Sequence, residues 1–229
     1  MTASAARSRR KAEAASDESL TERAYRALEE QIVTLQIAPG TVVSEAWLSK
    51  RLGIGRTPIR EALQRLGRER LVVIMPRRGI IVSDINIKTQ LRVLEVRREL
   101  ERLIARCAAR RASAEQRRRF EAIADGMENA ARGSDDIAFM RFDSEFNALM
   151  IEAARNEFAA GAMSLLHGLS RRFWYIHYKE VADLPLAARL HAEVARAVAR
   201  GAEEEAARAS DRLVDYIEEF ARATVTVDA

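Results

Sequence analysis

Polar side chains suited to nucleic-acid binding lie close together between positions 56 and 64. Beside them runs an apolar stripe with the i, i+3, i+4, i+7 spacing of a half-buried helix, formed by Ile59, Ala62, Leu63 and Leu66. Arg56, Arg60 and Gln64 lie off this stripe and would face outward. Arginines on the first turn of an exposed helix suit phosphates and guanine edges, although a surface helix with solvated arginines shows the same pattern.

Local signals place this helix in a helix-turn-helix. Thr57 is predicted to cap it by accepting a hydrogen bond from a free backbone N–H, and Pro58, which has no N–H, suits its start. Upstream, Ser44 is the predicted N-cap of another short helix, which Gly53 would end. Two short helices joined by a glycine-containing turn form a helix-turn-helix.

The residues that follow predict a β-hairpin. Residues 71–75 and 80–82 are rich in β-branched side chains, and Pro76-Arg77-Arg78-Gly79 separates them. This places Arg77 and Arg78 at the tip of a wing. Gly79 has no side chain, so its backbone could approach a groove or a phosphate closely. A winged helix-turn-helix with arginines on helix and wing indicates binding to duplex DNA.

Residues 19–84 resemble the DNA-binding domain of the GntR family of bacterial transcription regulators. The resemblance rests on Pro39-Gly40, Ser44-Glu45 with Leu48, the run from Arg56 to Leu63, Arg65-Leu66 and Pro76-Arg77-Arg78-Gly79. It implies that Arg56, Arg60 and Gln64 contact DNA, that Thr57 touches a phosphate, and that Arg77, Arg78 and Gly79 place the wing. Gly55 departs from the usual Ser or Thr, which removes a hydroxyl and is expected to lower affinity.

Composition allows one or two domains, with 229 residues of which 48% are hydrophobic. The net charge of +4 and the pI of about 9.6 do not by themselves establish nucleic-acid binding. Residues 1–18 form a basic arm without the apolar segment of a signal peptide. We expect this arm to be disordered, and either to contact phosphates or to remain simply solvated.

No run is long and apolar enough to predict a membrane span, so the sequence predicts a cytoplasmic protein. Cys107 is the single cysteine and cannot form an intramolecular disulfide. Its place on an apolar helix face favours a buried thiol over a redox sensor.

The rest of the chain, residues 85–229, is predicted to be an all-α domain, which makes the protein mostly α. The expected helices are 87–112, 114–131, 135–153, 157–181, 185–200 and 202–224. Helices of this number and length imply a compact bundle that folds as a second domain. Its amphipathic helices could bury their apolar faces within the bundle or against a second copy.

A second set of polar residues occurs in this bundle. Asp143 and Asn147 lie one helical turn apart, and His191 lies on another helix, with Arg97 and Arg141 as charge partners. Carboxylate and imidazole ligands from separate helices could hold a divalent metal such as Zn²⁺, Ni²⁺ or Mn²⁺. The alternative is a surface carboxylate and a partly buried histidine without a ligand.

Residues 87–222 resemble the FCD effector domain of FadR-type GntR regulators, through Leu94–Glu101, Phe142–Asn147 with Asn156, and Leu190–Val194. That family often binds a metal through one aspartate and three histidines. Asp143 and His191 match two ligands, whereas Asn147 and a position near Leu213 lack the other histidines. The metal site is therefore expected to be incomplete.

The resemblance implies a homodimeric regulator that binds a palindromic operator and senses an effector, repression being the usual mode. Arg97 and His191 could hold a small organic acid, because guanidinium pairs bidentately with carboxylate. Arg97 could equally form an internal ion pair with Asp143 or a nearby glutamate. The aromatic run Phe173–Tyr178 is expected in the core or at an interface, although Phe173, Ile176 and His177 could line a cavity. His167 has no predicted role.

Two other function classes stay open at this point. A metal-dependent enzyme would need a third strong ligand and a general base beside Asp143 and His191, and neither is evident, so we predict a protein that is not an enzyme. A non-specific architectural DNA-binding protein would rely on the basic arm.

Overall fold

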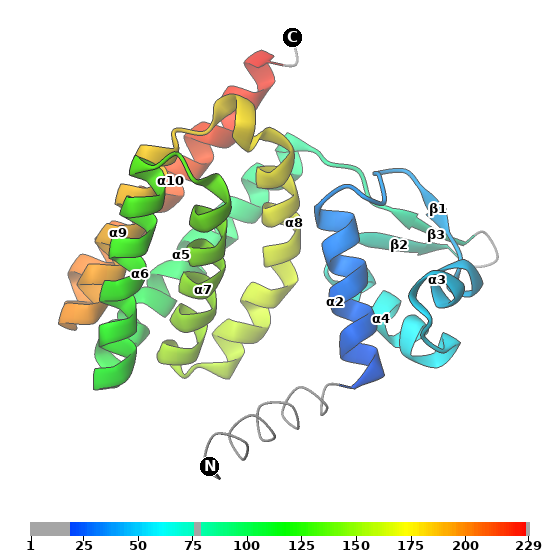
Figure 1. The fold of residues 1–229 in the computed structure, drawn as a ribbon, viewed down its shortest axis with the longest axis horizontal. Coiled ribbons are helices and arrows are strands. Elements are labelled where there is room, and N and C mark those ends of the chain that lie inside the picture. Colours follow the sequence, from blue (N-terminus) through cyan, green and yellow to red (C-terminus); the bar gives the residue numbers. More distant parts are fainter. Residues whose placement is uncertain (1–18, 76–78, 228–229) are drawn as a thin grey trace, which may run out of the picture. The chain divides into compact units, whose positions relative to one another are not determined.

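The computed structural model describes residues 19–75 and 79–227, and the chain divides into two compact units between Ile85 and Asn86. Figure 1 shows a mixed N-terminal unit and an all-helical C-terminal unit. Each unit is described by itself. No helix in the described part of the chain combines the length and the apolar character needed to span a lipid bilayer.

The N-terminal unit is a winged helix-turn-helix, as predicted. Its elements are α2 (Leu20–Val33), β1 (Val42–Val43), α3 (Glu45–Leu52), α4 (Arg56–Arg68), β2 (Val72–Met75) and β3 (Gly79–Val82). The antiparallel sheet has the order β1-β3-β2, with Ile81 opposite both Val42 and Val73. The apolar side chains between helices and sheet are fully buried; they include Leu28, Leu48, Ile59, Leu63 and Leu66.

Local capping sets the ends of α3. The Ser44 hydroxyl accepts the backbone N–H of Trp47 at 3.2 Å, and Gly53 ends the helix in a left-handed conformation with φ of 65°. Such a backbone suits glycine because a Cβ would be strained there. The predicted helix-turn-helix boundaries at Ser44 and Gly53 are therefore confirmed.

The predicted cap of α4 at Thr57 is wrong. Gly55 is the N-cap, its carbonyl accepts the N–H of Ile59 at 3.3 Å, and no side chain caps the helix. Thr57 already lies within the first turn, where its hydroxyl does not bond the orphan N–H groups. Pro58 tolerates this shift because none of the first-turn positions needs an intrahelical N–H bond.

Gly55→Ser is expected to stabilise the winged unit by about 0.5–1 kcal/mol, because it adds a capping hydroxyl and lowers the entropy of the unfolded chain. Gly55 has φ of −60°, and the nearest atom to an added Cβ is Pro58 Cδ at 3.9 Å. Urea unfolding followed by the fluorescence of Trp47, in a Trp174→Phe background, measures the change. Gly53→Ser is the opposite control and should destabilise; stabilisation by both would contradict the capping argument.

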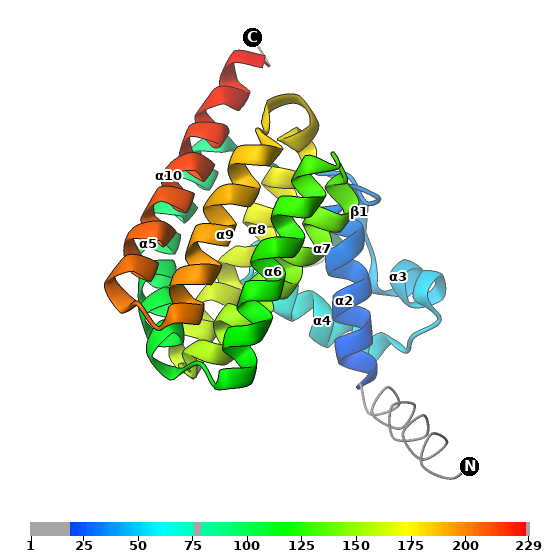
Figure 2. The same cartoon turned by 60° about the vertical axis from the view of Figure 1, so that its left-hand side comes forward.

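The C-terminal unit is a bundle of long helices. They are α5 (Ile87–Arg111), α6 (Ala114–Arg132), α7 (Asp136–Ala154), α8 (Glu157–Val181), α9 (Leu184–Arg200) and α10 (Glu203–Val227). Figures 1 and 2 show α9 between α6 and α10, and α5 contacts α7, α8, α9 and α10. Side-chain caps start most of these helices; one is a complete capping box between Ser113 and Gln116.

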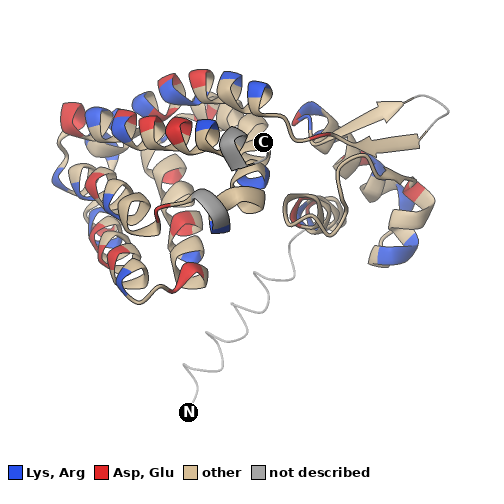
Figure 3. Cartoon of the chain, turned by 90° about the horizontal axis from the view of Figure 1, so that it is seen from above, with Lys and Arg blue, Asp and Glu red and all other residues tan. Residues whose placement is uncertain are grey.

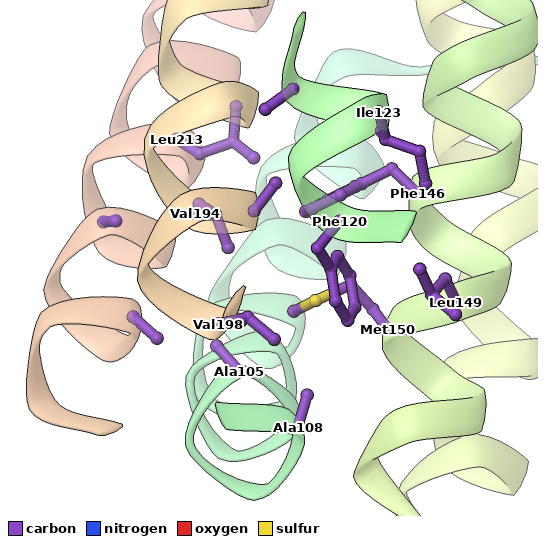
Figure 4. Packing of buried hydrophobic residues seen from close by; sticks show 14 of the residues in the cluster. Ala105, Ala108, Phe120, Ile123, Phe146, Leu149, Met150, Val194, Val198 and Leu213 are labelled. Atoms are coloured by element: carbon purple, nitrogen blue, oxygen red, sulfur yellow. The ribbon is translucent and has the colours of Figure 1, made fainter. Parts of the chain in front are cut away.

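The core of the bundle is apolar and closely packed. In Figure 4, Phe120 of α6 lies among residues of α5, α7 and α9, and Leu213 of α10 lies beside Val194. Cys107 is buried at 4% exposure, as predicted for a packed thiol. Gly126 allows α6 to approach α7, because an added Cβ would overlap the ring of Phe142.

Charged residues of both signs alternate along the helix surfaces (Figure 3). One regular series joins α5 to α10, where arginines four residues apart meet acidic partners: Arg98 with Asp215, Arg102 with Asp211, Arg106 with Glu204, and Arg110 with Glu203. Exposed pairs of this kind contribute little stability individually. Their regular order indicates that α5 and α10 run antiparallel.

Arg117 joins the ends of two helices. Its guanidinium donates to the carbonyl of Ala109, within the last turn of α5, at 2.8 Å and to that of Ala112, just beyond this turn, at 3.2 Å. It also donates to Val198 at 3.3 Å and Ala199 at 2.9 Å near the end of α9. Carbonyls at a helix end have no intrahelical partner, so one cation satisfies groups from both helices.

Candidate DNA-binding surface and polar cluster of the bundle

The first turns of α4 present an exposed polar surface. Arg56, Thr57, Arg60 and Gln64 are all exposed, while Ile59, Ala62, Leu63 and Leu66 on the other face are buried. This is the division of faces that the apolar stripe predicts. The surface could therefore contact a ligand without disturbing the core of the unit.

Arg60 makes a two-bond contact with Glu45, the first residue of α3. Arg60 Nε donates to Glu45 Oε1 at 2.8 Å, and Nη2 donates to Oε2 at 2.7 Å. These hydrogen bonds lower the pKa of the Glu45 carboxyl, so it is ionised at neutral pH. From the sequence, Glu45 has no predicted role beyond its place in the motif.

A second arginine fixes α4 to α2. The Arg65 guanidinium lies 3.4 Å from the ring centroid of Tyr25 and donates to Glu69 at 3.1 Å, and the Tyr25 hydroxyl donates to Glu69 at 3.0 Å. Glu69 is only 3% exposed. Burial, followed by the charge of Glu69, raises the pKa of Tyr25, so the phenol keeps its proton. This network sets the orientation of α4.

The hairpin of β2 and β3 forms as predicted, with Met75 opposite Gly79. Gly79 has φ of 99°, and an added Cβ would lie 3.2 Å from Val42 Cγ1. A glycine is thus required here by backbone conformation and crowding, whatever it contacts. Arg77 and Arg78, the predicted tip of the wing, lie outside the described residues.

In the bundle, Asp143 of α7 and His191 of α9 form a direct pair. His191 Nε2 lies 3.0 Å from Asp143 Oδ1, and Nδ1 lies 2.7 Å from the carbonyl of Ala187. Both ring nitrogens face acceptors, so the imidazole satisfies both only when doubly protonated. Phe139 and Phe146 pack edge-on against the ring.

Opposing effects act on the ionisation of this pair. Burial disfavours the charged imidazole, but the hydrogen bond and charge of Asp143 outweigh it and raise the pKa of His191. Burial likewise opposes the carboxylate, whereas the hydrogen bond and charge of His191 lower the pKa of Asp143. The two side chains form an ion pair around neutral to mildly acidic pH.

The stabilising effect of this pair should depend on pH. The contribution of His191 is fully present below its ordinary pKa of 6.5 and is lost as pH rises through its raised value. The contribution of Asp143 is fully present above 3.8 and is lost as pH falls through its lowered value. Asp143→Asn is therefore expected to cost about 1–2 kcal/mol between pH 4 and 6.5, and less at higher pH. Melting temperatures of the wild type and of Asp143→Asn, measured from pH 4.5 to 9, check this prediction. A difference in melting temperature that widens above pH 6.5 would contradict it.

The residues around this pair do not fit a metal ion. The Asn147 amide donates to the backbone carbonyl of Asp143 at 2.9 Å, and Leu213 is a core residue at 4% exposure. Within residues 19–75 and 79–227, no group of three or more His, Cys, Asp or Glu side chains could hold a metal. Asp143 and His191 are two strong donors, and a tight Zn²⁺ or Ni²⁺ site needs at least three.

Arg97 of α5 pairs with Glu101, one turn further along its own helix, with Nη2 at 2.5 Å from Oε1. Of the alternatives open from the sequence, the structure shows the pair with a nearby glutamate. Arg97 also acts electrostatically on Asp143, where its charge favours the carboxylate. Arg141, the other proposed charge partner, lies 5.2 Å from the ring centroid of Phe142 instead.

His167 of α8 lies within electrostatic range of Asp143 and Arg97, which sequence reasoning missed. Burial and the charges of Arg97 and Arg171 lower the pKa of His167 to about 4, while the charge of Asp143 acts in the opposite direction. The hydrogen bond between Gln90 and Ser170 at 3.4 Å sets α8 against α5. Because nothing local links His167 to α5 or α7, no sequence signal could have placed it there.

The aromatic run of α8 lies only in part in the core. Phe173 is 3% exposed, with its ring 6.3 Å from that of Phe220 on α10, and Trp174 lies 4.5 Å from the same ring. Ile176 is 40% exposed. The expected packing role holds for Phe173 and Trp174.

Comparison with known proteins decides the family. The sequence pattern described as "Bacterial regulatory proteins, gntR family" matches residues 20–82, and that of the FCD domain matches residues 92–216. The chain belongs to the GntR family, in the group that carries an FCD domain. It is a DNA-binding transcription regulator of this type.

Relatives and solved structures agree with this GntR assignment. The "HTH-type transcriptional repressor RspR" of Escherichia coli K12 is 27% identical over 198 residues, which cover 86% of this chain and 87% of that protein. The fold is similar to E. coli McbR/YncC, with a TM-score of 0.72 at 16% identity over 92% of this chain and 97% of that one. A GntR regulator from Rhodococcus sp. RHA1 has a TM-score of 0.62 at 19% identity over 89% and 97% of the two chains.

Proposed function

We propose that this GntR regulator binds a palindromic operator as a homodimer and represses transcription there. The exposed arginines at the start of α4 carry the proposal, since they are the groups best suited to read a major groove. One recognition helix reads only a short half-site, and a two-fold dimer doubles it. The relative RspR is described as a repressor, which supports repression. A regulator that binds the bacterial chromosome acts in the cytoplasm.

Within this proposal, the DNA-binding side chains have separate roles. Arg56 and Arg60 contact bases or phosphates, Gln64 lies one turn further along the same face, and the Thr57 hydroxyl reaches a phosphate because capping does not occupy it. Gly79 brings the wing close to the duplex. Arg77 and Arg78 are assigned to the wing tip from the sequence alone.

Selection from a pool of random DNA duplexes tests the DNA-binding proposal directly. We expect enrichment of an inverted repeat whose half-sites are about one helical turn apart, bound by two copies of the chain. Enrichment of no sequence, together with a steep salt dependence, would instead favour a non-specific architectural protein.

We further propose that the polar cluster of Arg97, Asp143, Asn147 and His191 binds a small organic acid that changes operator affinity. Charged groups from α5, α7 and α9 occur there inside the bundle, and such groups orient ligands in protein sites. Coupling requires the acid to bind with different affinities to the DNA-bound and free arrangements.

A thermal-shift screen against small organic acids, with and without Ni²⁺, Zn²⁺ and Mn²⁺, tests this second part. A ligand that binds only the folded protein raises its melting temperature. We expect a shift with acid alone, and that acid should then alter affinity for the selected operator. A shift that requires metal would contradict the metal-free site, and no shift with any acid would count against the effector role.

A further inference from the structure

Glu45 is an acidic residue on the surface proposed to bind DNA, where basic residues are expected. Its carboxylate lies beside Arg60 and within the electrostatic influence of Arg56, on the first turn of α3, and is 29% exposed. A negative charge here repels phosphates and lowers affinity for DNA of any sequence. Its presence therefore needs a compensating benefit.

The geometry of the ion pair suggests that benefit. A guanidinium carries five N–H donors in a planar fork. Glu45 accepts one from Nε and one from Nη2 of Arg60, at 2.8 and 2.7 Å, along one edge of the fork. The other N–H of Nη2 and both of Nη1 remain for DNA. The free N–H of Nη2 and the adjacent N–H of Nη1 form the outer pair of donors that matches O6 and N7 of a guanine.

The pair also fixes a long side chain before DNA arrives. Arg60 is 58% exposed, so its own packing does little to order it. Two hydrogen bonds to a residue on another helix restrict its rotation and its plane. An ordered guanidinium loses less entropy on binding and is directed at one base pair rather than at any nearby phosphate.

We propose that Glu45 is a positioning residue for sequence recognition, which holds Arg60 in the orientation that reads one base pair. Glu45 thus increases discrimination between operator and random DNA while it lowers affinity for DNA in general. This inference rests on the proposed role of Arg60 as a base contact.

Glu45→Gln tests the proposal, because it removes the charge and one of the two acceptors while preserving shape. Glu61→Gln is the matched control: Glu61 is an exposed carboxylate next to Arg60 in sequence, and it accepts a hydrogen bond from Thr21 at 2.6 Å. Each variant removes one negative charge from the N-terminal unit, so the two change its net charge equally. The measurements are dissociation constants for the selected operator and a random duplex at one fixed salt concentration, with base preference at each operator position.

We expect Glu45→Gln to tighten binding to the random duplex about 2–5-fold and to lower the operator-to-random ratio about 10-fold, with relaxed preference at one base pair. Glu61→Gln should leave the ratio within about two-fold of wild type. A ratio that rises with Glu45→Gln would show that Glu45 competes with DNA for Arg60. A lower melting temperature with an unchanged ratio would show a purely structural role. Either result overturns the proposal.

The Arg60→Ala background separates this inference from the function it rests on. There, Glu45→Gln should no longer change the operator-to-random ratio, because the residue it positions is gone. Equal losses on operator and random DNA for Arg60→Ala would refute base reading by Arg60 itself. A specific loss for Arg60→Ala with no effect of Glu45→Gln would refute the positioning role alone.

Discussion

Arg60→Ala is expected to weaken binding to the selected operator by about 1–3 kcal/mol, while binding to a random duplex changes by less than about three-fold. Arg60 is exposed on the second turn of α4, and its outer donors point away from the Glu45 carboxylate that holds its inner edge. A bidentate contact to a base is lost in full on mismatched sequences, so its removal affects the operator alone.

Competition and direct titration at two salt concentrations measure this difference, because affinities for DNA have meaning only at a stated salt. Arg68→Ala is the control: Arg68 is also exposed on α4 but lies in the last turn, away from the proposed reading surface. Arg68→Ala should change operator affinity no more than random affinity. If Arg60→Ala reduces both affinities equally, Arg60 contacts a phosphate.

Arg117→Met is expected to lower the free energy of unfolding of the helical unit by about 2–4 kcal/mol, which corresponds to roughly 5–12 °C in melting temperature. Methionine keeps the apolar stem but removes the Arg117 donor from four backbone carbonyls at the ends of α5 and α9. Of these, the Val198 carbonyl still accepts the N–H of Gly201 at 3.0 Å. Partly buried carbonyls that lose a charged partner pay the full cost of desolvation.

Chemical unfolding followed by the fluorescence of Trp174, in a Trp47→Phe background, measures this loss. Arg118→Met is the matched control, because Arg118 is the next residue and, within the described residues, pairs only with Glu115 on the exposed surface of the same helix. It should change stability by less than about 0.5 kcal/mol. Equal effects of the two substitutions would refute the joining role of Arg117.

Gly201→Ala provides an independent check on Arg117. Gly201 has φ of +72°, and an added Cβ would lie 2.6 Å from Arg117 Nη1. Part of the stability that Gly201→Ala costs should therefore be regained in the Arg117→Met background, because only the backbone strain at position 201 remains there.

The sequence by itself determined the elements and the family. Helix starts at Ser44, Asn86 and Ser113 follow from side chains that bond an N–H only three residues away. The spacing of apolar residues on 56–66 determined which face of α4 is buried. Because these interactions are local, the order of residues alone encodes them.

Only the tertiary structure decided which distant polar groups meet. It pairs Arg60 with Glu45, Asp143 with His191 and Arg117 with the end of α9, and it brings His167 within electrostatic range of Arg97. Such contacts depend on how each helix is rotated and how pairs of helices cross. Those quantities are set by close packing of the whole core, which no local pattern specifies.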